Sequence, residues 1–130
     1  RGVSLRAHVD LLPEPASAGA GRRAVAEVLK DWGVSPETVS DAMLVVSEIV
    51  TNAVLHAPAE EPLSLDLSLA DGVLRVAVSD SSDRHPLRRS PAGYDEGGRG
   101  IGILDALATR WGVSDRVGGK SLWFEIDLVS

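Results

Sequence analysis

The chain contains no cysteine and only one methionine, one phenylalanine and one tyrosine among its 130 residues. The absence of cysteine excludes a disulfide scaffold, a thiolate zinc site and a cysteine nucleophile. No apolar run approaches the ~20 residues that a transmembrane helix requires, which argues against a membrane protein. No signal peptide is visible either, and we therefore expect a cytoplasmic location.

Positive charge is also scarce. The chain has 13 Lys and Arg against 19 Asp and Glu, which gives a formal net charge of −6. Binding to nucleic-acid phosphates requires clustered cations, so this composition argues against a direct nucleic-acid partner. The length is typical of one globular domain, and we expect residues 1–130 to form a single domain.

Hydrophobic periodicity predicts both strands and helices. Apolar and polar residues alternate over residues 3–11, 63–78 and 122–128, with a tight turn at Asp71-Gly72, which is typical of half-buried strands and a hairpin. Helical spacing predicts a helix ending at Trp32, a second from Ser35-Pro36 to Ala57-Pro58, and a third from Gly100 to about Thr109. This order of elements predicts an α+β fold with helices packed on one face of hairpin-connected strands.

The second helix carries two stripes of different character. Its predicted buried stripe consists of Val39, Ala42, Val46, Val50, Ala53 and Ala57. Glu48, Asn52 and His56 are spaced four residues apart and form a second, polar stripe. An acid, an amide and an imidazole suit a bound water, hydroxyl or metal ion, whereas a solvated face is the alternative interpretation. The neighbouring Leu44 and Leu55 favour a covered face.

Asp80 lies at the end of a predicted strand. It has the same parity as Leu74, Val76 and Val78, so the alternation directs its carboxylate towards the core side of the sheet. A carboxylate in that position is costly unless it meets a donor. The donor could be a backbone N–H at the start of the following loop or the amino group of a ligand.

Glycine is concentrated just before the third helix, over residues 97–102. Glycine-rich backbone that leads into a helix N-terminus exposes N–H donors at the positive end of the helix dipole and suits a phosphate group. Arg99 adds a positive charge, although a flexible loop would also be glycine-rich. Residues 81–99 show no periodicity, and an aperiodic segment of that length is usually functional.

The order of these three sites resembles the GHKL ATPase superfamily with its Bergerat nucleotide-binding fold. The chain looks like the small anti-sigma-factor serine kinases of the RsbW and SpoIIAB type. Residues 48–56 (EIVTNAVLH) resemble the family's N box, residues 98–102 (GRGIG) its second glycine box, and residues 119–125 (GKSLWFE) its C-terminal strand. The resemblance covers nearly the whole chain and implies a two-layer α/β sandwich, with helices on one face of a mixed, mostly antiparallel sheet.

The resemblance also implies roles for individual residues, with ATP and Mg²⁺ as cofactors. Asn52 would coordinate the magnesium ion, and Glu48 would act as the general base. Asp80 would bind the adenine amino group, and Ser121 would support adenine binding through its hydroxyl. The remaining cofactor-binding residues would be those of the second glycine box, Gly98, Arg99, Gly100, Ile101 and Gly102, and residues 81–99 would form the ATP lid.

By the same resemblance, the chain would be a protein serine/threonine kinase that regulates a sigma factor. It would phosphorylate a STAS-type anti-anti-sigma partner on serine, bind the sigma factor and form a homodimer. Residues 81–84 contain no glycine, whereas the family's first glycine box has glycines shortly after the Asp. A catalytically degenerate nucleotide- or partner-binding module is therefore one alternative, and the ATP-binding domain of a larger sensor or phosphatase protein is another.

Overall fold

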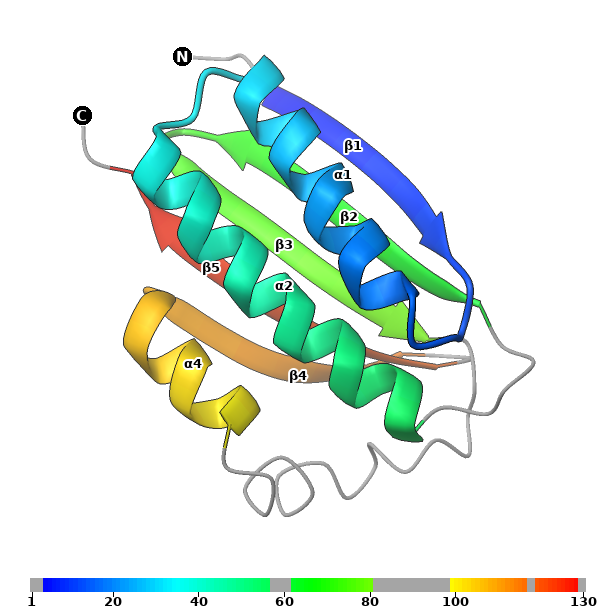
Figure 1. The fold of residues 1–130 in the computed structure, drawn as a ribbon. Helices are drawn as coiled ribbons and strands as arrows, with labels where there is room; N and C mark the ends of the chain where they lie inside the picture. The colour runs from blue at the N-terminus through cyan, green and yellow to red at the C-terminus, as the bar shows by residue number, and fades with distance from the viewer. Residues whose placement is uncertain (1–3, 57–61, 81–98, 117–118, 129–130) are drawn as a thin grey trace.

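The structure is a computed structural model that describes residues 4–56, 62–80, 99–116 and 119–128 of the chain (Figure 1). The elements are β1 (Ser4–Leu11), α1 (Ser17–Asp31), α2 (Pro36–His56), β2 (Leu63–Ala70), β3 (Val73–Asp80), α4 (Arg99–Leu107), β4 (Arg110–Arg116) and β5 (Gly119–Asp127). The predicted helix stop at Ala57-Pro58 and nearly all of the predicted lid, residues 81–98, lie outside the described residues.

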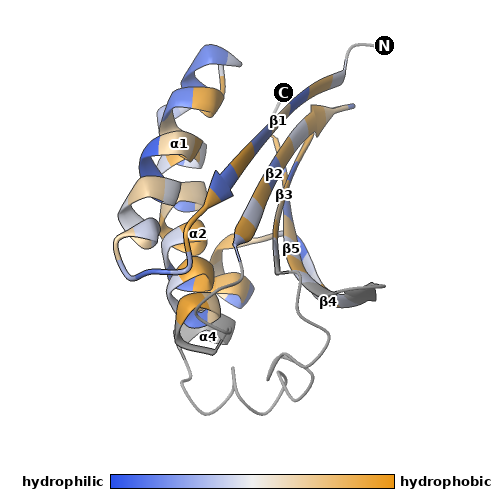
Figure 2. Cartoon of the chain, turned by 90° about the vertical axis from the view of Figure 1, so that its right-hand side faces the viewer, coloured by the Kyte–Doolittle hydropathy of each residue, from blue (hydrophilic) through white to orange (hydrophobic). Residues whose placement is uncertain are grey.

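The strands form one five-stranded sheet in the order β1-β2-β3-β5-β4, and every described pairing is antiparallel. The helices lie on one side of this sheet, as the side view shows (Figure 2). The two-layer arrangement expected from the sequence is therefore confirmed, but the expected mixed character of the sheet is wrong for the described strands, because none of their pairings is parallel. The strand order is set by β5, which inserts between β3 and β4 although it is last in the chain.

Local sequence signals explain where the elements begin and end. Gly33 has a φ of 78° just after α1, the left-handed conformation that glycine adopts readily, and its N–H bonds to the Lys30 carbonyl. The Ser35 hydroxyl accepts a hydrogen bond from the Thr38 N–H at 3.3 Å, which caps α2. Asp71 and Gly72 both have positive φ, which is typical of the two-residue turn of a twisted hairpin.

The core fills the space between the helices and the sheet. All of the predicted α2 stripe that the structure describes is buried, from Val39 to Ala53, and α2 packs against β3 in the middle of the sheet. Phe124 on β5 is fully buried at the centre. Each such side chain contributes about 1.5–3 kcal/mol relative to an exposed one, so burial holds the helical layer on the sheet. Within the described residues, no helix is long and apolar enough to cross a bilayer.

Candidate functional site

The candidate site is built on the side of α2 that lies away from α1. Arg22 on α1 donates a hydrogen bond to the Ser47 hydroxyl at 3.0 Å, which marks the side of α2 that faces α1. At 100° per residue, Asn52 projects about 140° away from Ser47. The two flanking helices, α1 and α4, lie on opposite sides of α2 (Figure 1). Asn52 therefore belongs to the side that faces α4.

Glu48 lies one turn before Asn52, and both side chains are half-buried. The carboxylate and the amide are therefore neighbours on one helix side, as the sequence predicted. The adjacent Val45 and Ile49 are almost completely buried and hold this side of α2 against the core. The solvated-face interpretation is weakened for Glu48 and Asn52 because neither is fully exposed.

The described residues do not by themselves cover the face at Leu44, whose side chain is 47% exposed. The expectation that this face is covered stays a prediction. Leu44 projects closer to the outward side of α2 than Asn52 does, because Asn52 follows eight residues later and eight residues advance the helix by about 80° beyond two full turns. Leu55 and His56 belong to α2, but their side chains lie outside what the structure describes.

The third helix of the layer, α4, is anchored at its C-terminal end. Leu104 is fully buried, and the Trp111 indole N–H donates to the Asp105 carboxylate at 2.9 Å, which ties α4 to β4. The Thr109 N–H then bonds to the Glu125 carbonyl of β5 at 2.7 Å. These contacts fix the direction of a nine-residue helix whose N-terminal N–H groups have no partner within the helix.

The second glycine box forms the start of α4. The helix begins at Arg99 and includes Gly100, Ile101 and Gly102, whereas Gly98 lies outside the described residues. Gly102 is exposed, and a Cβ built there would meet no atom of the described residues within 4 Å. The backbone N–H groups of this first turn are a favourable environment for an anion.

The ends of two central strands complete the site. Asp80 is the last residue of β3, and the register pairs it with Leu63 of β2 and Lys120 of β5. Ser121 is buried and pairs with Ser79, but the alternation along β5 places it with Trp123 and Glu125 on the face opposite to the core residues Leu122 and Phe124. The structure therefore does not bring Ser121 onto the helical side of the sheet, and its expected part in adenine binding stays a prediction. The register thus places Lys120, which the motif analysis did not single out, directly opposite Asp80. Only strand pairing could have identified it, because the two residues are 40 positions apart in the sequence.

The described residues therefore bring together most of the predicted positions at one end of the helical layer. The C-terminal half of α2, the end of β3, the start of β5 and the N-terminus of α4 lie towards the same end of the molecule (Figure 1). A carboxylate, an amide and the backbone N–H groups of the first turn of α4 suit a phosphate-bearing ligand with a divalent cation. The side chains of Asp80 and Arg99 lie outside the described set, so their roles stay predictions.

Sequence comparison places these features in a known family. A family model described as "Histidine kinase-like ATPase domain" matches residues 11–126, which is most of the chain. The chain is also 42% identical over 74 residues to an uncharacterized protein of Streptomyces coelicolor, SCO4941. That match covers 55% of this chain and 70% of the relative.

Structural comparison finds the same fold in three solved structures. The RsbU and RsbW domains of Rv1364c from Mycobacterium tuberculosis match with a TM-score of 0.74 and 22% identity, over 95% of this chain and 32% of that one. The chain thus spans about a third of the length of that protein. The SiaB-SiaC complex from Pseudomonas aeruginosa matches with a TM-score of 0.62 and 15% identity, over 92% and 88% of the two chains. The histidine kinase domain of a blue-light activated histidine kinase from Erythrobacter litoralis has a TM-score of 0.55 and 23% identity, over 88% and 60%.

Proposed function

The chain belongs to the histidine kinase-like ATPase domain family, and on this premise we propose that it is an ATP-dependent protein serine/threonine kinase. Its substrate would be a serine of a STAS-type anti-anti-sigma protein, and it would regulate a sigma factor that it also binds, as a homodimer. ATP binding follows from the family. The solved RsbW and SiaB-SiaC structures with the same fold support a regulatory partner protein for this chain.

The pairing of Glu48 with Asn52 on the α4 side of α2 is the observation that carries this proposal. Both side chains are half-buried and lie one helical turn apart, so a ligand between α2 and α4 would contact both. A polar surface that only contacts solvent does not require a carboxylate and an amide one turn apart beside the N-terminus of α4. The residues present therefore fit an ATP–magnesium complex.

Each residue would have a distinct task in this site. Asn52 would supply a carboxamide oxygen to Mg²⁺, an ion that binds few protein ligands and is coordinated largely by phosphate oxygens. Mg²⁺, when bound, neutralises phosphate charge. The backbone N–H groups at the start of α4 would orient the phosphates, and Asp80 and Ser121 would hold the adenine. Such positioning and charge stabilisation account for most of the catalysis of phosphoryl transfer.

Glu48 would act as the general base in the transfer. As the partner's serine oxygen forms its bond to the γ-phosphorus, the Glu48 carboxylate would accept the hydroxyl proton. The bond between the γ-phosphorus and the bridging oxygen breaks, and ADP leaves with that electron pair. A positioned base of this kind contributes about 10²–10⁴-fold to a rate.

A nucleotide-binding module without catalytic activity is the second candidate. It is favoured by residues 81–84, which contain no glycine where the family's first glycine box is expected. It is opposed by the presence of both Glu48 and Asn52. The two candidates differ in one measurable property, the transfer of the γ-phosphate to a protein.

Incubation with γ-labelled ATP, Mg²⁺ and a STAS-domain protein that binds the chain tests the proposal. We expect Glu48→Gln to retain ATP and to slow label transfer by about 10²–10⁴-fold. Asn52→Ala should abolish the Mg²⁺-dependent part of nucleotide binding, measured by calorimetry with and without chelator. Glu27→Gln, at an exposed carboxylate on α1, is the matched control for the loss of charge in Glu48→Gln. Thr51→Ala, at an exposed position on α2, is the matched control for truncation of a polar side chain in Asn52→Ala.

Three outcomes would contradict parts of this assignment. ATP binding without any label on the partner would replace the kinase by the binding module. Normal phosphorylation by Glu48→Gln would remove Glu48 from the role of base. Unchanged Mg²⁺-dependent affinity in Asn52→Ala would refute the metal-ligand role.

A further inference from the structure

The sheet has a second face, which no described helix covers (Figure 2). The register aligns its outward side chains in cross-strand rows. One row contains, in strand order, His8, Asp66, Ala77, Trp123 and Gly112. The neighbouring row contains Arg6, Ser68, Arg75, Glu125 and Arg110.

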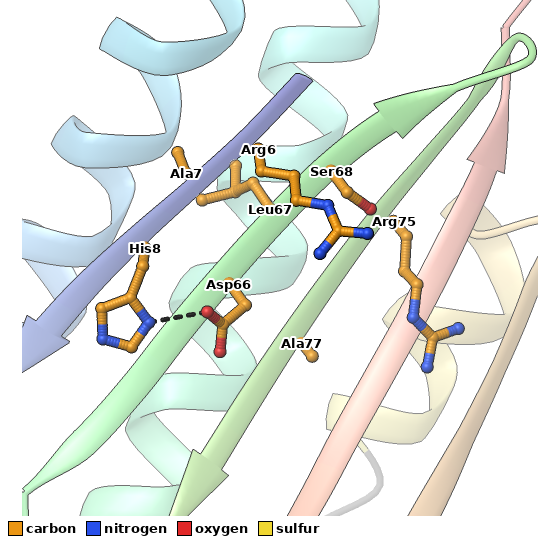
Figure 3. Close-up of a pocket in the computed structure, with 8 residues that line it drawn as sticks. All are labelled: Arg6, Ala7, His8, Asp66, Leu67, Ser68, Arg75 and Ala77. Atoms are coloured by element: carbon orange, nitrogen blue, oxygen red, sulfur yellow. Dashed lines mark hydrogen bonds and ion pairs between the residues drawn. The ribbon is translucent and has the colours of Figure 1, made fainter. Parts of the chain in front are cut away.

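A cavity of about 540 Å³ lies over β1, β2 and β3 on this face (Figure 3). It exists because Ala77, in the middle of its row, carries only a methyl group between Asp66 and Trp123. The Trp123 ring does not fill the space, because it lies over Gly112 on the far side: a Cβ at Gly112 would be 2.8 Å from Trp123 Cζ2. The Arg75 guanidinium stacks 4.5 Å from the centre of the same ring.

Positive charge collects around this cavity in a chain that is acidic overall. Arg6, His8 and Arg75 line it, against the single carboxylate of Asp66. Arg75 is already bonded to Glu125 at 3.0 Å. Arg6 differs, because within the part of the chain that the structure describes it has no hydrogen bond or ion pair. Its guanidinium extends over β2 beside Ser68 (Figure 3).

The geometry of His8 adds to this positive character. Its Nδ1 lies 2.6 Å from an Asp66 oxygen, and its Nε2 lies 2.8 Å from an Asp10 oxygen. Carboxylates only accept hydrogen bonds, so both contacts are satisfied when both ring nitrogens carry protons. The hydrogen bonds to Asp66 and Asp10 raise the pKa of His8, which favours that imidazolium form. The imidazolium carries one positive charge against the two carboxylates of Asp66 and Asp10, of which only Asp66 lines the cavity. Arg6 is left to act on an incoming group.

We propose that this cavity binds a small anion with carboxylate or phosphate oxygens, held chiefly by the guanidinium of Arg6 with the Ser68 hydroxyl beside it. A guanidinium presents paired N–H donors that match two oxygens of such a group. The volume lies within the usual range for small-ligand sites, which is about 300–1,000 Å³. The sheet separates this site from the α2–α4 region, so it is distinct from the proposed nucleotide site.

Backbone amide NMR titration of the full chain tests the proposal with citrate, succinate and inorganic phosphate as probes. Ionic strength is held constant with chloride, which serves as the non-specific anion. We expect saturable shifts at Ser68, Arg75 and Ala77 for citrate or phosphate, but not for chloride. Saturable shifts with succinate but not phosphate would indicate a carboxylate site, and the reverse would indicate a phosphate site. Shifts on α2 or α4 alone would place binding elsewhere and overturn the proposal.

Variants provide a second, steric test. Arg6→Gln and Ala77→Leu should each weaken binding at least tenfold, whereas Arg6→Lys should retain part of it. Ala77→Leu adds bulk on the outer face and leaves the core unchanged, and Ala77→Ser is its matched control. Arg23→Gln, at an exposed arginine on α1, controls for the loss of one charge. Equal affinity in Arg6→Gln and the wild type would overturn the proposal, as would binding of an acidic peptide but none of the small anions.

Discussion

Replacement of Leu104 by alanine tests whether the anchoring of α4 supports the nucleotide site. Leu104 is fully buried, and α4 has nine residues, a length at which an isolated helix is only marginally stable. The position of its N-terminus therefore depends on packing at Leu104 and on the bond between Trp111 and Asp105. Leu104→Ala removes the first of these anchors.

The expected cost in stability is about 2–5 kcal/mol, the range for a buried Leu→Ala change. A protein of this size has a total stability of about 5–15 kcal/mol, so the variant should still fold. The melting temperature should fall by roughly 6–25 °C at about 3–5 °C per kcal/mol. Leu29→Ala on α1 is the matched control, because Leu29 is equally buried but lies on the helix away from the site.

The assay compares melting temperature with ATP affinity at about 10 °C, close to the usual temperature of maximum stability, where both variants should be folded. Both should lose similar stability, but only Leu104→Ala should lose affinity, by at least about tenfold or 1.4 kcal/mol. Leu29→Ala should stay within about twofold of the wild type. Equal losses of affinity in the two variants, or none in Leu104→Ala, would refute the link between α4 and nucleotide binding.

Two further predictions concern the outer face of the sheet. Asp66→Asn should lower the pKa of His8, measured by NMR titration of the imidazole, because the hydrogen bond to Asp66 is the largest cause of the raised value. Because the pKa of His8 is raised in the folded state, its protonation stabilises the fold fully below about pH 6.5, and this stabilisation is lost as the pH rises through the folded-state pKa. The melting temperature of the wild type should therefore decline over that pH range. Asp66→Asn should make this decline smaller. Gly112→Ala should displace the Trp123 ring and cost about 1–3 kcal/mol, seen as altered tryptophan fluorescence and earlier thermal unfolding. An unchanged fluorescence spectrum would contradict that packing.

Much of the fold follows from local pattern. The alternation over residues 63–78 predicts β2 and β3, and Asp71-Gly72 predicts the turn between them, because a two-residue period and two positive φ angles are local requirements. The buried stripe of α2 was predicted from helical spacing alone, and its described members are buried. The family resemblance is confirmed by the match over residues 11–126.

Other features depend on contacts that no local pattern encodes. Leu44 is apolar but largely exposed, because its place in α2 lies outside the side that packs on the sheet. Likewise, the insertion of β5 between β3 and β4 decides that Lys120, and not Ser121, pairs with Asp80. The roles of Asp80 and Ser121 in adenine binding stay predictions.

By itself, the sequence determined most of the helices and strands, the buried stripe of α2, and the spacing that makes Glu48 and Asn52 neighbours, because these depend on periodicity within one segment. Only the tertiary structure decided strand order, the side of α2 that faces α4, and the cavity over Ala77. These depend on residues far apart in the chain, such as Ala77 and Trp123, which become neighbours through antiparallel pairing. Long-range register is set by burial summed over the whole sheet, and no single segment contains that information.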